Sequence, residues 1–212
     1  MTHEILFYQK KLVLASRSPR RSELLREHGF SFACLPADDT AERAFDPARD
    51  RSPEDFVQEQ AHAKAQNVAK RFPGEDLVVL GCDTVAVAAG VLLGKPQDRA
   101  DARRMLRELS GSVHTVTTGF CLLNPRFFQQ PHLEAVTTTL RMDSLSDTQL
   151  EAYLDSGRWE GKAGAFGYQD GNDWLEILEG TASNVVGLPV ERLMELLGMA
   201  GGRKIFPQME WK

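Results

Sequence analysis

The sequence predicts a mixed α/β domain, because short apolar runs typical of strands alternate with segments that carry helix start and stop signals. The first apolar run, residues 11–15 (KLVLA), is interpreted as a strand, and the next few residues lead directly into a helix. Ser18 is a good N-cap for this helix, Pro19 suits its first position and Gly29 suits its end. The chain therefore opens with a strand, a tight turn and a helix.

Elements of both kinds follow along the rest of the chain. The sequence predicts helices over residues 52–71 and 99–109, a further helix opened by Ser146 and a last one from Pro189. It predicts strands over residues 77–81, 113–123 and 133–142, and a hairpin over residues 86–93 that turns near Gly90. The order of these elements indicates one mixed α/β unit with interleaved parts.

The overall charge excludes one broad class of partner. The 212 residues carry a formal net charge of −5, whereas general nucleic-acid binders present a basic face to the phosphate backbone. An acidic protein still binds a small polyanion when a few cations and a metal are focused in one cleft. The sequence therefore predicts no nucleic-acid partner and leaves a small phosphorylated ligand open.

Cysteine usage and apolar runs indicate the compartment. Cys34, Cys82 and Cys121 are odd in number and widely spaced, and they form neither a CxxC pair nor a zinc pattern. Reduced thiols in a cytosol are the expected state of such cysteines. No apolar run approaches the length of a membrane span, and the N-terminal segment lacks the order of a signal peptide. We expect a cytoplasmic protein with no membrane partner.

The turn at residues 16–21 (SRSPRR) is the first candidate site. It stands at the start of a predicted helix, where unpaired N–H groups and the helix dipole favour a phosphate. Its two hydroxyls and three arginines add donors that match phosphate oxygens. An ordinary capped helix with solvated arginines is an equal alternative, because the pattern lies outside the standard phosphate-binding loop.

Asp83 is the second candidate, at the end of the apolar strand 77–81, with Thr84 beside it. A carboxylate close to burial is normally paired, hydrogen-bonded or metal-bound. Ligands of open α/β sheets bind at the carboxyl ends of strands, which is where this residue is expected. The alternative is a carboxylate that caps a turn.

Two lysines and a glycine-rich segment complete the candidates. Lys64 lies beside the apolar stripe of the helix 52–71, and Lys95 lies in a rigid Gly-Lys-Pro turn. Residues 157–171 hold five glycines and several aromatic residues, with Gln169 able to read a base edge. Solvated lysines and a flexible loop are the alternatives. His114 is interpreted as a satisfied structural histidine, so catalysis is expected to use metal-activated water rather than a side-chain nucleophile.

Six blocks together resemble the Maf family. They are residues 16–21 (SRSPRR), 81–84 (GCDT), 94–96 (GKP), 110–119 (SGSVHTVTTG), 162–169 (KAGAFGYQ) and 183–189 (SNVVGLP). They occur in the family's order and cover about residues 11–197. The resemblance implies a fold like that of the inosine-triphosphate pyrophosphatases, with a long central mixed sheet and a cleft between two lobes. It places one domain at residues 11–200, an N-terminal extension at 1–10 and a C-terminal tail at 201–212.

The resemblance also implies an activity and assigns roles to individual residues. It implies a homodimer that hydrolyses nucleoside triphosphates to monophosphate and pyrophosphate with a divalent cation, Mg²⁺ or Mn²⁺. Asp83 is then the proton acceptor and a metal ligand. The resemblance assigns Arg20, Thr84 and Gln169 to base preference, and Ser16, Arg21, Lys64 and Lys95 to the phosphate path. The second metal ligand is left open among Asp38, Asp39 and Glu42.

The same residues indicate the base. The branch of the family that acts on dTTP and UTP resembles this chain, whereas the 7-methyl-GTP branch tends to have Trp, Gln and Glu at or near the positions of Arg20, Thr84 and Gln169. The chain departs from the family at Cys82, usually Ala, and at Asp170, usually Gly. A non-catalytic nucleotide-binding regulator of cell division, also proposed for the family, is the alternative function.

Overall fold

The computed structural model describes residues 12–46, 52–127 and 131–198. The expected extension at 1–10 and tail at 201–212 lie outside these residues, and the division of residues 11–200 into two lobes stays a prediction. None of the cysteines forms a disulfide. Within the described ranges, no helix has the length and apolar character needed to cross a membrane.

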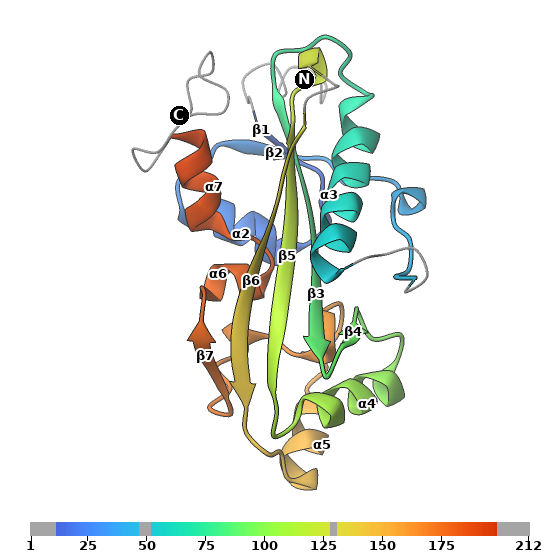
Figure 1. The fold of residues 1–212 in the computed structure, drawn as a ribbon, viewed down its shortest axis with the longest axis vertical. Helices are drawn as coiled ribbons and strands as arrows, with labels where there is room; N and C mark the ends of the chain where they lie inside the picture. The colour runs from blue at the N-terminus through green and yellow to red at the C-terminus, as the bar shows by residue number, and fades with distance from the viewer. Residues whose placement is uncertain (1–11, 47–51, 128–130, 199–212) are drawn as a thin grey trace.

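A seven-stranded mixed sheet forms the centre of the molecule (Figure 1). Its order is β2 (Phe32–Cys34), β1 (Leu12–Leu14), β3 (Val78–Ala88), β5 (Val113–Leu123), β6 (His132–Met142) and β7 (Leu175–Glu179), with β4 (Val91–Leu93) beside β3. β2, β1 and β3 are parallel, and every other pairing is antiparallel. The mixed sheet confirms the predicted fold class.

The helices follow the predicted order. They are α2 (Pro19–Glu27), α3 (Pro53–Ala69), α4 (Arg99–Leu109), α5 (Asp147–Asp155), α6 (Ala182–Val186) and α7 (Val190–Leu197). Short 3₁₀ turns occupy Asp39–Ala41, Pro125–Phe127, Ala163–Ala165 and Tyr168–Asp170. The predicted helix to residue 71 ends at Ala69, while β7 and α6 are short elements that the sequence pattern did not indicate.

β3 is the element whose prediction was wrong in length. Its apolar run suggested a strand ending at Gly81, but the strand continues through Asp83 and Thr84 to Ala88. Pairing with β5 continues along this stretch as far as Val87, so the polar pair interrupts the apolar pattern without interrupting the strand. The predicted hairpin is confirmed, because Ala88 pairs with Val91 across a two-residue turn.

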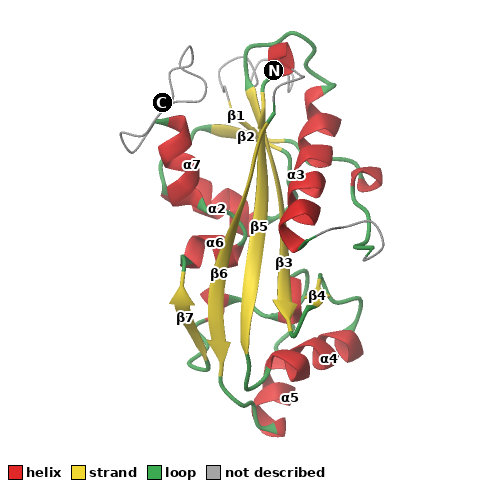
Figure 2. Cartoon of the chain, viewed as in Figure 1, coloured by secondary structure: helices red, strands yellow, loops and turns green. Residues whose placement is uncertain are grey.

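α3 covers one face of the sheet and lies very close to it (Figure 2). A Cβ added to Gly81 of β3 would lie 2.1 Å from the carbonyl oxygen of Ala61. A Cβ added to Gly119 of β5 would lie 2.5 Å from the carbonyl group of Val57. The two glycines therefore let the helix backbone approach the sheet, which brings Lys64 within reach of β3.

The opposite face carries two hydrophobic cores. In the first, Leu25 of α2 and Leu193 of α7 pack against Leu14, Leu80 and Phe120 of the sheet. In the second, α4, α5 and the glycine-rich segment pack against the other end of β3, β5 and β6. Figure 1 shows β5 and β6 running through both regions, so the long strands connect the two cores.

His114 of β5 is buried beside the second core. It is 2% exposed, and its ring lies edge-on to that of Phe166 with centroids 5.4 Å apart. The structural interpretation holds, but the expectation of satisfied nitrogens was wrong, because neither ring nitrogen has a hydrogen-bond partner among the described residues. Burial lowers the pKa of His114 from 6.5 to about 4, against a smaller opposing effect of the Ser112 backbone.

We expect acid to destabilise the fold through His114. In the unfolded chain this imidazole takes up a proton near pH 6.5, but in the folded chain only near pH 4. The neutral imidazole therefore contributes its full share of the free energy of unfolding above about pH 6.5. This share, about 3 kcal/mol, is lost as the pH falls towards 4. Urea denaturation at pH 7 and 4.5 should show that His114→Leu loses about 2 kcal/mol less stability on acidification than the wild type. An equal loss in both proteins would contradict this.

Candidate active site

A pocket lies beside a stretch of β3 that has no neighbouring strand on one side. β1 accompanies β3 only to Leu80, whose carbonyl oxygen accepts a hydrogen bond from the Ala15 N–H at 2.8 Å, and β4 begins to pair at Ala86. Between them, no described strand covers this edge of β3. Asp83 and Thr84 lie in this gap, and as consecutive strand residues they point to opposite faces of the sheet. The pocket, about 440 Å³ in volume, wraps around the bare edge and reaches both side chains.

On the α3 face, one lysine joins two carboxylates. The Lys64 ammonium donates to Asp83 Oδ1 at 2.6 Å and lies 3.0 Å from Glu42 Oε1, although its side chain is only 5% exposed. Burial alone would raise the pKa of Glu42, but the neighbouring Lys64, with smaller effects of Lys95 and Arg21, leaves this pKa below its ordinary value. Glu42 is therefore anionic at neutral pH, and the cluster presents two carboxylates at the pocket.

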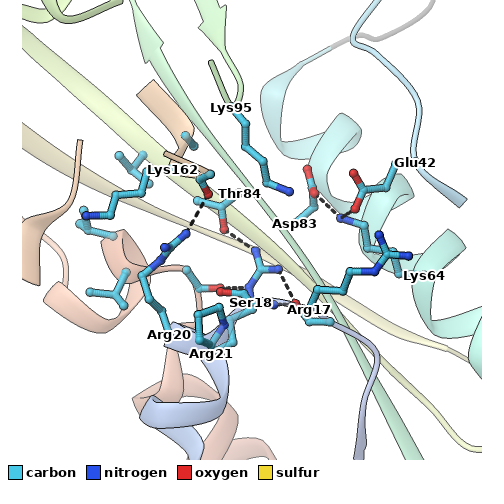
Figure 3. A pocket seen from close by; sticks show the side chains of 18 of the residues that line it. Arg17, Ser18, Arg20, Arg21, Glu42, Lys64, Asp83, Thr84, Lys95 and Lys162 are labelled. Atoms are coloured by element: carbon cyan, nitrogen blue, oxygen red, sulfur yellow. Dashed lines mark hydrogen bonds and ion pairs between the residues drawn. The ribbon is translucent and has the colours of Figure 1, made fainter. Parts of the chain in front are cut away.

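On the other face, Arg21 ties the start of α2 to the sheet. Its guanidinium donates to Ser16 Oγ at 3.1 Å, to Thr84 Oγ1 at 2.9 Å and to the carbonyl oxygen of Gly187 at 2.7 Å. Thr84 Oγ1 is also 2.9 Å from Thr118 Oγ1. Figure 3 shows Arg21 and Thr84 beside the Asp83–Lys64–Glu42 cluster. The turn and the strand therefore meet at one place.

The N-cap side chain leaves the start of α2 uncapped, and because Pro19 has no N–H the first amide donor of the helix is that of Arg20. Ser18 is the N-cap residue, as predicted, but its side chain makes no capping hydrogen bond. Arg20 Nη2 donates to the carbonyl oxygen of Gly161 at 2.8 Å, linking α2 to the glycine-rich segment. Lys95 makes no ion pair with the described residues, and its chain extends into the pocket in Figure 3. Positive groups therefore approach the pocket from α2, from α3, from the turn that holds Lys95 and from the glycine-rich segment.

The structure brings all eight predicted site residues into this pocket. The lining includes Ser16, Arg20, Arg21, Lys64, Asp83, Thr84, Lys95 and Gln169. Of the three open acidic candidates, Asp38 lies outside the lining and bonds to Asn67 and Arg71. Asp39 reaches the rim, where it pairs with Arg17 in solvent. Glu42 alone among the three contacts Lys64.

Sequence reasoning missed two features of the lining. Lys162 reaches the pocket from the glycine-rich segment, and the Gly187 carbonyl orients Arg21. Both lie in blocks that carry the family resemblance, so position in those blocks was a usable signal for Lys162. The role of Gly187 had no sequence signal, because the acceptor of the Arg21 hydrogen bond is a backbone oxygen.

The fold and the pocket define a mixed α/β protein with a cation-lined cleft around two carboxylates. A family model described as Maf-like protein matches residues 11–200, and the chain belongs to this family. The chain is 50% identical over 189 residues to a dTTP/UTP pyrophosphatase of Rhodopirellula baltica, covering 89% of this chain and 81% of that one. It is 40% identical over 191 residues to a dTTP/UTP pyrophosphatase of Koribacter versatilis, covering 90% and 94%.

A solved structure supports the fold alone. A HAM1 protein from Coxiella burnetii superposes with a TM-score of 0.50 at 15% sequence identity, covering 90% of this chain and 99% of that one. The likeness extends over almost the whole described chain, so the expected long-sheet fold is confirmed. At this identity it carries no statement about the residues of the pocket.

Proposed function

We propose that this protein is a nucleoside triphosphate pyrophosphatase that hydrolyses dTTP and UTP to the monophosphate and pyrophosphate. The observation that carries the proposal is the meeting of the Asp83–Lys64–Glu42 cluster with Arg21 and the α2 start in one pocket. Relatives that bear this activity in their names match nine-tenths of the chain. The lining supplies cations for phosphates and a carboxylate for an attacking water, which is what the reaction needs.

The pocket residues fit a divalent cation. Asp83 Oδ1 and Glu42 Oε1 both lie within 3.0 Å of the same Lys64 nitrogen, so two carboxylates converge on one small region. The described residues contain no group of three or more acidic, histidine or cysteine ligands. Mg²⁺ is commonly held by one or two carboxylates and completes its shell with water and substrate phosphates. Asp83 and Glu42 would hold the ion, which would neutralise charge that develops on the phosphates.

The protein groups divide the remaining work between them. Arg21, Lys95 and Lys64 bind and orient the triphosphate, and the amide groups at the start of α2 add donors for its oxygens. Asp83 orients the attacking water and accepts its proton. Arg20, Thr84 and Gln169 line the region that contacts the base. Since phosphoryl transfer needs little covalent chemistry from the protein, positioning and electrostatic stabilisation supply most of the rate enhancement.

The direct test is a pyrophosphate-release assay over a panel of nucleoside triphosphates, with and without Mg²⁺. We expect release from dTTP and UTP that depends on the cation and exceeds release from the purine and 7-methyl-GTP substrates. If no nucleotide yields pyrophosphate although the protein binds them, the non-catalytic regulator is the better description. A preference for 7-methyl-GTP would retain the chemistry and overturn the base assignment.

We also propose that the protein works in the cytoplasm as a homodimer, as the family resemblance implies. Light scattering after size-exclusion chromatography should then give twice the mass of the chain. The mass of a single chain would contradict the homodimer and would not affect the proposed reaction.

Replacing Gln169 with Glu should change base preference more than maximal rate. Gln169 is exposed in the pocket lining, where its amide can both donate and accept, whereas a carboxylate only accepts. We expect the ratio of kcat/KM for dTTP to that for dCTP to change about tenfold while kcat stays within about threefold. The ratio is measured by competition between the two nucleotides. An unaltered ratio would remove Gln169 from base recognition.

A further inference from the structure

Behind the base side of the pocket lies a buried ion pair that the proposed mechanism does not use. Lys162 Nζ donates to both carboxylate oxygens of Asp170 at 2.6 Å, and the two side chains are 10% and 8% exposed. Burial lowers the pKa of Lys162, and Asp170 opposes this effect. An ion pair at this depth stabilises little unless its other hydrogen bonds are made, so its partners matter.

Those partners fix the pair to the second core. The hydroxyl of Tyr153 on α5 donates to Asp170 Oδ2 at 2.7 Å and accepts the Gly167 N–H at 3.2 Å. Tyr153 is itself 3% exposed, and its ring packs edge-on against Trp174 with centroids 5.5 Å apart. The carboxylate of Asp170 is therefore held by one residue of a rigid helix and one of the glycine-rich segment.

The ion pair closes a short loop that carries part of the pocket wall. Lys162 and Asp170 are the two ends of the loop, and Phe166 and Gln169, which lie between them, line the pocket. Because the ends are joined to each other and to α5, the loop has little freedom to move relative to the second core. The structure thus connects a residue outside the pocket lining, Asp170, to residues inside it.

The Gln169 amide lies near the ion pair, on the same side of the Gly167 backbone. A methyl group placed on Gly167 would lie 2.5 Å from Lys162 Nζ, 2.8 Å from Asp170 Oδ2 and 2.9 Å from Gln169 Nε2. The ammonium, the carboxylate and the Gln169 amide therefore border the same small space beside the Gly167 backbone. A displacement of the ion pair changes the space that the Gln169 amide occupies.

The residue that precedes this loop holds Arg20. The carbonyl oxygen that accepts from Arg20 Nη2 belongs to Gly161, the residue before Lys162. Figure 3 shows Lys162 and Arg20 near each other, across the pocket from Asp83 and Lys64. The ion pair is therefore connected to two of the three residues that we assign to the base and is remote from the carboxylates.

We infer that Asp170 is a positioning residue for base selection, which acts through Lys162 and Tyr153 by holding Gln169 and Gly161 in place. The inference rests on the proposed function, because it concerns how that reaction chooses its base. Asp170 contacts neither the cationic residues assigned to the triphosphate nor the carboxylate cluster. Its loss therefore leaves the rate of the chemical step unchanged and weakens the recognition of the nucleoside.

The test compares Asp170→Asn and Tyr153→Phe with the wild type in the full chain. For Asp170→Asn we expect KM for dTTP to rise about tenfold and the dTTP to dCTP ratio of kcat/KM to fall about tenfold, with kcat within about threefold. Tyr153→Phe removes the two hydrogen bonds of the hydroxyl, to Asp170 and from the Gly167 N–H, but no charge, so about a threefold fall in the ratio is expected. It also decides the question should Asp170→Asn fail to fold.

Trp174→Phe is the matched control, because it loosens the packing around Tyr153 but keeps the Tyr153 hydroxyl and the ion pair. Thermal unfolding of each variant shows whether the stability losses are comparable. The inference is overturned if the folded Asp170 and Tyr153 variants keep the wild-type ratio, or if Trp174→Phe changes the ratio as much as they do. Absence of pyrophosphate release by the wild type would instead overturn the proposed function.

Discussion

Asp83→Asn should abolish nearly all turnover, by about 10³-fold or more in kcat, while the protein stays folded. Asparagine has the shape of aspartate but neither accepts a proton nor offers an anionic ligand to a cation. The substitution leaves Lys64 its 3.0 Å contact with Glu42 and an amide oxygen in place of the lost carboxylate, so the buried ammonium keeps partners. We therefore expect a catalytic loss with only a small loss of stability.

The measurement is single-turnover pyrophosphate release at saturating dTTP and Mg²⁺, with urea denaturation of the same samples. Asp38→Asn is the matched control, because it neutralises a carboxylate of the same region that bonds to Asn67 and Arg71 outside the pocket. Its kcat should stay within about threefold of the wild type. Turnover by a folded Asp83→Asn protein at the wild-type rate would show that another group activates the water.

The structure places Asp83 in the pocket, although the strand ending assigned to it was wrong. The apolar run stops at Gly81, and a sequence pattern cannot distinguish a strand that ends from one that loses its neighbour. Here β1 ends beside Leu80 while β5 continues to pair with β3. The polar residues therefore mark the carboxyl end of the parallel part of the sheet, where ligands bind, and not the end of β3 itself.

The choice among Asp38, Asp39 and Glu42 illustrates what sequence alone does not supply. All three lie within five residues, and each has the right chemistry for a cation. The 3₁₀ turn at Asp39–Ala41 separates their directions, so that Asp38 meets Arg71 and Glu42 meets Lys64. Because Lys64 lies in α3 and Arg71 just beyond its end, only the tertiary structure shows which of the three carboxylates joins the cluster at Asp83.

The glycine-rich segment, for which the sequence left a flexible loop as the alternative, is ordered by the packing of its aromatic residues. Phe166 is 4% exposed and belongs to the second core, while Tyr168 packs against it. The reason for the order was not accessible, because it depends on Tyr153 of α5 reaching Asp170. The aromatic residues indicated that the segment packs, but not which polar groups fix its ends.

Arg21→Lys should reduce kcat/KM about 10²-fold although the positive charge is kept. Arg21 serves three acceptors at once, Ser16 Oγ, Thr84 Oγ1 and the Gly187 carbonyl, from three different segments. A lysine ammonium lacks the planar fork of donors that spans them, so at least one acceptor loses its partner and the α2 start shifts relative to β3. A shift of about 1 Å in a positioning group is enough for a loss of this size.

The loss should appear in kcat as well as in KM, because Arg21 orients both the α2 start and Thr84 during the reaction. Arg26→Lys is the matched control on the same helix, since Arg26 is exposed, lies outside the pocket and stacks on Phe32 at 5.6 Å. Steady-state kinetics on dTTP should give Arg26→Lys a kcat/KM within about threefold of the wild type. If Arg21→Lys also stays within that range, charge alone suffices at this position. The three hydrogen bonds of Arg21 would then be structural and would not set the geometry of the reaction.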